Sequence, residues 1–195
     1  MRPILVAAMS GLLVLAGACS RYGVDTTVSP DARFTGYHTF TVLPVPRAND
    51  GYARTAVDDP MARNSQANIA LRQAVIQVLV DRGYRVDDRN PDFAVALYGS
   101  AREPLDIAIW NYNYQQFATG THATPFSTHP ATYPPGTVVM DVVGQTGSER
   151  LLVWRGWSTA KITDDPMQNV HAFIKVGTAI AERFPAAAGH TVATR

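Results

Sequence analysis

Cysteine is almost absent from this sequence, which holds a single one, Cys19, near its start. One cysteine cannot form an internal disulfide, so a folded domain must be stabilised by its apolar core alone. An excess of one charge is also absent, because 17 Lys and Arg residues oppose 16 Asp and Glu residues. This balance gives no electrostatic basis for binding nucleic acid, and no basic run favours an anionic lipid surface.

The sequence also lacks an apolar run long enough to cross a bilayer. The run at residues 4–15 (ILVAAMSGLLVL) follows the single charge of Arg2, whereas a membrane span needs about 20 apolar residues. A positive charge, a short apolar run and small residues at Ala16 and Ala18 are the parts of a bacterial export signal. We therefore expect residues 1–18 to be a signal peptide.

Two interpretations of the cleavage region stay open. The small residues before Cys19 fit the general signal peptidase, which would release a soluble periplasmic protein. The run LAGAC also resembles a lipobox, in which the cysteine receives diacylglycerol, although its leucine lies one position further back than usual. An unpaired thiol is a liability in an oxidising compartment, and a lipid thioether is not. The single cysteine thus favours a lipoprotein carrying fatty acids such as palmitate on Cys19, with residues 19–33 as acylated N-terminus and tether.

The residue after the cysteine bears on which membrane holds the lipid. Ser20 stands where an Asp would signal retention in the inner membrane of enteric bacteria. The sequence therefore favours the outer membrane, facing the periplasm, over the inner membrane.

The rest of the chain suffices for one domain, which we place at residues 34–185, followed by a mobile tail at 186–195. The predicted strands are 37–45, 84–86, 92–101, 137–143 and 150–161, and residues 24–28 alternate as an edge strand would. Asp59-Pro60 and Asp165-Pro166 are typical helix starts, and Gly83 and Pro185 are typical ends. This order predicts an α+β fold, a two-layer sandwich of a mainly antiparallel sheet of about five strands with two helices on one face.

The clearest predicted hairpin lies at residues 136–161. Pairing Val143 with Leu151 places Leu152 and Trp154 on one buried face, under the last helix. The reverse face then carries Asp141, Arg155, Trp157 and Lys161, which suits contact with solvent or with a partner. In the last helix, Gly177 is expected to let the helix approach the sheet near Gly156.

Several short motifs occur in a characteristic order. They are Phe34-x-x-Tyr37-x-Thr39-Phe40, Gly83-Tyr84, Asp92-Phe93, Gly136-Thr137-Val138, Val153-Trp154-Arg155-Gly156 and Phe184-Pro185. With a signal sequence that ends at a cysteine, this pattern resembles the bacterial envelope lipoproteins that carry the domain of unknown function DUF4136. The resemblance implies an envelope location and an α+β fold, and it brings no catalytic residue with it.

The common catalytic signatures are missing from the sequence. It has no nucleophile elbow, no His-Glu-x-x-His, no phosphate-binding glycine loop and no pair of cysteines, and we expect no cofactor and no enzymatic activity. Adjacent acids at 58–59, 87–88 and 164–165 fit capping and turns better than acid/base pairs. No local spacing of His38, His122, His129 and His171 enforces a metal site.

Residues 103–135 form the most unusual segment, a long insertion without clear periodicity. Its aromatic residues are Trp110, Tyr112, Tyr114, Phe117, Phe126 and Tyr133, among Thr, Asn, Gln and Pro. Long loops in compact domains are usually functional or disordered, and aromatic rings bind sugars and peptide side chains. The alternative is a flap that covers a sheet edge. We take Trp110, Tyr112, Tyr114, Phe117 and Tyr133 as candidate binding residues.

The sequence therefore predicts a non-enzymatic envelope lipoprotein that binds or supports an envelope protein or peptidoglycan, with a membrane contact through its lipid. The alternative is an enzyme acting on cell-wall material, with its site at the insertion and His122, His129, Asp141 or Arg155 as candidates.

Overall fold

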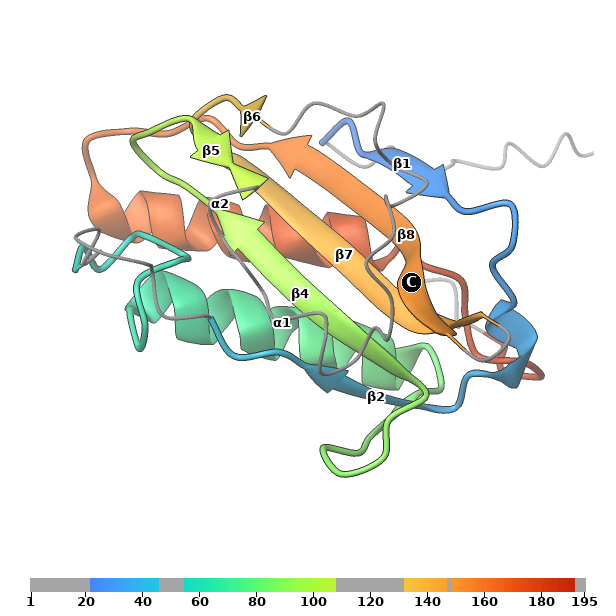
Figure 1. Ribbon diagram of the computed structural model, residues 1–195. Helices are drawn as coiled ribbons and strands as arrows, with labels where there is room; N and C mark the ends of the chain where they lie inside the picture. Colours follow the sequence, from blue (N-terminus) through green and yellow to red (C-terminus); the bar gives the residue numbers. More distant parts are fainter. Residues whose placement is uncertain (1–21, 46–54, 108–131, 147–148, 192–195) are drawn as a thin grey trace, which may run out of the picture.

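The structure is a computed structural model that describes residues 22–45, 55–107, 132–146 and 149–191 (Figure 1). The predicted signal peptide, Cys19 and most of the insertion lie outside the described residues. Within these ranges, no helix has both the length and the apolar character needed to span a membrane.

The domain is built on a mixed sheet of six strands in the order β1-β8-β7-β4-β2-β3, with two helices across one face (Figure 1). The strands are β1 (Asp25–Val28), β2 (Thr39–Val42), β3 (Arg85–Val86), β4 (Phe93–Gly99), β7 (Thr137–Thr146) and β8 (Glu149–Thr159). The helices are α1 (Gln66–Asp81) and α2 (Pro166–Ala181), and the 3-10 helix η1 is Phe34–Gly36. The predicted α+β sandwich is confirmed.

The pairing within the sheet follows from the connections between strands. β2 is parallel to β3 and to β4. The chain leaves β2, returns through α1 to the other end of the sheet, and enters β3 in the same direction as β2. All other pairs of the large sheet are antiparallel. The short strands β5 (Leu105–Asp106) and β6 (Thr132–Tyr133) form a second, two-stranded sheet at the two ends of the insertion.

The predicted start of the first helix is wrong. α1 begins at Gln66 and not at Asp59-Pro60, because Ser65 is its N-cap and accepts a hydrogen bond from the Asn68 N–H at 3.0 Å. Asn64, at a φ of 62°, interrupts any earlier helix. The predicted start at Asp165-Pro166 is correct, since the Asp165 carboxylate accepts the N–H groups of the first turn.

Gly177 serves the packing of the two helices against each other. A Cβ on Gly177 would clash with Cδ1 of Leu71 on α1, so Gly177 lets α2 approach α1 and is not the residue that brings α2 to the sheet at Gly156. Gly156 does face α2, because a Cβ there would lie 2.9 Å from Cγ2 of Ile180. It also makes room for the Trp154 ring.

The β7–β8 hairpin has a different register from the one expected. Val142 is opposite Trp154, and the register shifts at the next residue, where Val143 is opposite Leu152. This β-bulge at Val153 takes Leu152 off the face that Trp154 occupies, because one extra residue reverses the alternation of side chains. Trp154 itself is 1% exposed in the core next to α2, as predicted.

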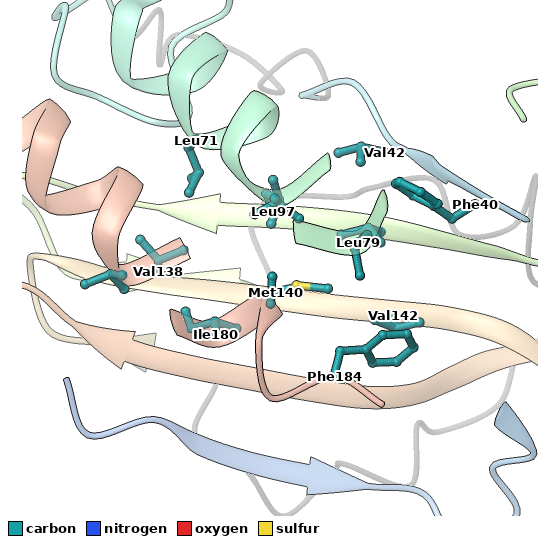
Figure 2. Packing of buried hydrophobic residues seen from close by; sticks show 14 of the residues in the cluster. Phe40, Val42, Leu71, Leu79, Leu97, Val138, Met140, Val142, Ile180 and Phe184 are labelled. Atoms are coloured by element: carbon teal, nitrogen blue, oxygen red, sulfur yellow. The ribbon is translucent and has the colours of Figure 1, made fainter. Parts of the chain in front are cut away.

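The first hydrophobic core lies between the helices and the sheet. Figure 2 shows Leu97, Met140 and Val142 of the sheet near Leu79 of α1 and Ile180 of α2. At one end of this core, aromatic residues of the short sequence motifs form a cluster of Phe34, Tyr37, Phe40, Tyr84, Phe93, Trp154 and Phe184. Edge-to-face and tilted ring pairs of this kind add stability beyond the area that they bury.

Polar contacts fix this aromatic cluster to the strands around it. The Asp92 carboxylate accepts hydrogen bonds from the N–H groups of His38 and Thr39, both at 2.8 Å, which joins the start of β2 to the start of β4. The Tyr84 hydroxyl donates to the Pro185 carbonyl at 3.0 Å. Burial raises the pKa of Tyr84 to about 12, so this donor stays protonated.

The opposite face of the sheet is covered by a second core. Its buried members are Leu43, Val45, Met61, Ala94, Ala96, Tyr98, Leu105, Tyr133 and Val139. Leu105 and Tyr133 belong to β5 and β6, so the two ends of the insertion pack onto the sheet. The expectation that this face is open to solvent at Asp141 and Arg155 is therefore wrong, since they are 0% and 8% exposed.

Both ends of the described chain contact the domain. β1 lies in the segment expected to be a tether and is an edge strand paired with β8. Ala187, in the segment expected to be a mobile tail, is buried, and its N–H donates to the Arg82 carbonyl at 2.9 Å. The His190 ring packs over Gly83, where the φ of 92° and a Cβ contact of 2.6 Å favour glycine.

Candidate functional site

The candidate site lies on the second face of the sheet, where β7 and β8 place Asp141 beside Arg155. The two residues are cross-strand partners in the antiparallel register. Directly opposite side chains on one face of a sheet are close enough to interact. Tyr133 of β6 and the half-buried Trp157 of β8 lie next to this pair. The ring centroids of Tyr133 and Trp157 are 6.1 Å apart.

Asp141 and Arg155 form a buried, two-point ion pair. Nε of Arg155 donates to Oδ1 of Asp141 at 2.6 Å, and Nη2 of Arg155 donates to Oδ2 at 2.7 Å. This fork geometry satisfies both carboxylate oxygens and is the arrangement for which arginine is suited. Each charge compensates the desolvation of the other.

The Tyr133 hydroxyl lies near this pair and is enclosed by the second core. The residue is 4% exposed, and its hydroxyl lies close to the Arg155 guanidinium. Burial raises the pKa of Tyr133, while Arg155 lowers it and Asp141 raises it. The hydroxyl therefore stays neutral at physiological pH, and the Tyr133 ring packs in the second core on the sheet.

Most of the predicted binding residues lie outside the described residues, namely Trp110, Tyr112, Tyr114 and Phe117, and so do His122, His129 and Cys19. Tyr133 is the member that the structure places, and it is a buried residue at the base of the insertion. Of the candidates for the enzyme alternative, Asp141 and Arg155 are brought together as the ion pair, beside Tyr133.

A second buried polar network joins three distant segments at one end of the sheet. The Asp58 carboxylate, 1% exposed, accepts hydrogen bonds from Asn169 at 2.8 Å and from Arg102 at 3.1 Å. Asn169 also bonds both backbone groups of Thr163, at 2.8 and 2.9 Å. Sequence reasoning missed this network because its partners are far apart in the chain, and no local pattern marks them.

Each of the three pairs of adjacent acids has a member in a cap or turn, as predicted. Asp165 caps α2, Asp87 accepts hydrogen bonds from the N–H groups of Arg89 and Asn90, and Asp59 accepts one from the Met61 N–H at 2.8 Å. Asp58 differs from them, because its carboxylate is the centre of the buried network. Within the part of the chain that the structure describes, no three His, Cys, Asp or Glu residues are grouped as metal ligands.

Comparison with known families gives a match over most of the chain. The family model described as "Domain of unknown function (DUF4136)" matches residues 24–186, which runs from the residue before β1 to the residue after Pro185. A search of curated proteins finds no significant match to this sequence.

Solved bacterial structures are similar to this chain at low sequence identity. A DUF4136 family protein from Bacteroides thetaiotaomicron has 12% identity and a TM-score of 0.49, covering 83% of this chain and 93% of its own. A PDZ domain protein from Parabacteroides distasonis has 13% identity and a TM-score of 0.48, covering 83% and 35%. The PelC dodecamer from Paraburkholderia phytofirmans has 11% identity and a TM-score of 0.39, covering 83% and 99%.

Proposed function

The chain belongs to the DUF4136 family, and from this premise we propose that it is a non-enzymatic lipoprotein of the bacterial envelope. Its lipid on Cys19 holds the domain on the periplasmic side of the outer membrane. There the domain binds or supports another envelope component, either a protein or peptidoglycan.

The observation that carries this proposal is the position of β1. It is an integral strand of the sheet, and only residues 20–24 separate it from Cys19. A fully extended chain spans about 3.3–3.6 Å per residue, so a lipid on Cys19 keeps the sheet within about 20 Å of the bilayer surface. An anchor this short holds the domain at the membrane, as suits a module that acts on a neighbouring envelope component.

The state of the ion pair supports binding over catalysis. Asp141 and Arg155 are the candidates for the enzyme alternative that the structure describes, and each is bonded to the other through two contacts. A general acid or base must exchange a proton with substrate, and this pair is 0% and 8% exposed. Their role in the proposal is to align β7 with β8 beneath the base of the insertion.

Cell fractionation of a Cys19→Ser variant tests the proposal. We expect the wild-type chain in the membrane fraction, where it is released by detergent, and the variant in the soluble periplasmic fraction. The two proteins should melt at the same temperature, because Cys19 precedes every described element. Release of both proteins into the soluble fraction would contradict the lipid anchor and leave ordinary secretion as the explanation.

A further inference from the structure

The two edges of the six-stranded sheet are protected differently. At the β2 edge, β3 pairs only with Thr39 and Phe40. Beyond β3, the Arg72 guanidinium of α1 donates hydrogen bonds to the carbonyls of Val42, at 2.8 Å, and of Leu43. A side chain that occupies these backbone groups prevents another strand from adding to this edge.

The β1 edge has no such protection in the described part of the chain. The Ser29 N–H donates to the Val153 carbonyl at 2.9 Å, and the register pairs Thr27 with Arg155. Because hydrogen bonding alternates along an antiparallel strand, Thr26 and Val28 direct their N–H and C=O groups away from β8. β1 is the terminal strand of the sheet, and Val28 is 48% exposed.

We propose that β1 is the contact through which two copies of this chain associate, by antiparallel pairing of their β1 strands about a twofold axis at Thr26. This register uses the outward backbone groups at all three positions, because Thr26 then bonds Thr26 of the second copy. The same register places Val24 opposite Val28 of the second copy and continues the sheet across both molecules.

The side chains of β1 are compatible with pairing to themselves in this register. Asp25 faces Thr27 of the second copy and not a second Asp25, so no like charges are opposed. The exposed Val28 gains an apolar neighbour in Val24, which already packs against the first core. This inference goes beyond the proposed function, although a common membrane anchor would raise the effective concentration of the two strands.

Disulfide cross-linking tests the pairing in the full chain with Cys19→Ser, which removes the lipid and the only native thiol. Adding Thr26→Cys puts one thiol of each copy on the axis, with Cα atoms about 5.5 Å apart, which is within disulfide range. Thr27→Cys is the matched control, since the two thiols are then offset along the strands. Val86→Cys, on the protected edge and 50% exposed, measures random collision.

We expect about tenfold more cross-linked dimer from Thr26→Cys than from either control after mild oxidation. Sedimentation of the Cys19→Ser chain should also show a dimer, and Thr26→Pro should convert it to a monomer. Proline at this position removes only an outward N–H and keeps the hydrogen bonds to β8.

Equal cross-linking in all three variants, a monomer at every concentration, or capture of a different envelope protein by Thr26→Cys would overturn the proposal. Because these variants lack the lipid, failure here is distinct from failure of the anchor.

Discussion

At the scale of single residues, the indole of Trp154 is buried in the aromatic cluster of the first core. It is 1% exposed and packs edge to face on Phe184, at 5.4 Å between ring centroids. Trp157, three residues along β8, is half-buried on the other face against Tyr133. Residues of the same type on the same strand thus make different contributions to stability.

We expect Trp154→Ala to lower the free energy of unfolding by about 3–5 kcal/mol, a large share of the stability of a domain this size. Trp157→Ala should cost much less. Urea denaturation of both variants checks this, and equal losses would mean that the two faces of β8 are wrongly assigned.

The buried ion pair gives a second test at this scale. Removing one partner leaves the other charge buried and unpaired, so Asp141→Ala should lower the free energy of unfolding by about 3–5 kcal/mol. The double change Asp141→Leu with Arg155→Met removes both charges and should recover most of that loss. Denaturant titration of the two variants measures their free energies of unfolding. A double variant as unstable as Asp141→Ala would show that the charges are needed for another contact.

The burial of a single residue could be predicted where the alternation of side chains along its strand determines which face it lies on. The alternation of β8 placed Trp154 in the core despite the wrong register, because the true pairing differs by two positions at that point and leaves the face unchanged. Asp141 and Arg155 were misplaced, because their burial depends on a second core that local sequence does not show. That core is assembled from chain segments without a common period.

At the scale of elements, the close approach of α1 and α2 depends on Gly177. We expect Gly177→Ala to lower the free energy of unfolding by about 1–3 kcal/mol, although alanine favours helix, because its Cβ meets the Leu71 side chain. Thr178→Ala, at the next and half-buried position of α2, is the control and should be mild. Thermal melting of both measures the difference, and a Gly177→Ala variant as stable as wild type would mean that the helices lie further apart.

The insertion is an element whose two ends are fixed in the second core by Leu105 and Tyr133. We expect the triple change of Tyr112, Tyr114 and Phe117 to Ser to abolish recovery of a native partner or cell-wall fragment from membranes, with little change in melting temperature. Aromatic residues are often the main contributors to binding energy in recognition surfaces. A loss of several kcal/mol in stability would instead assign these residues to the fold.

Most elements could be predicted from periodicity, since the helices and the long strands match their expected ranges apart from their ends. The boundaries that failed have specific causes. Asn64 has a left-handed backbone conformation, so α1 starts later than expected. The bulge at Val153 makes the hairpin register differ from the expected one. Parallel pairing of β2 with β3 and β4 also could not be read from local pattern, because it depends on where α1 returns the chain.

At the scale of the whole molecule, the two cores and the sheet between them account for the family motifs. Phe34, Tyr37, Phe40, Tyr84, Phe93 and Phe184 all belong to one aromatic cluster, and Asp92 holds the strands at its edge. These motif residues therefore contribute to the fold and not to a binding surface.

Because the connection from Cys19 to β1 is short, the proposed lipid determines where this molecule acts. Mass spectrometry of the mature protein, purified from membranes, measures it most directly. We expect an N-terminal peptide that begins at Cys19 and carries the mass of diacylglycerol with its fatty acids. An N-terminal peptide that begins at an unmodified Cys19 would contradict the lipid anchor.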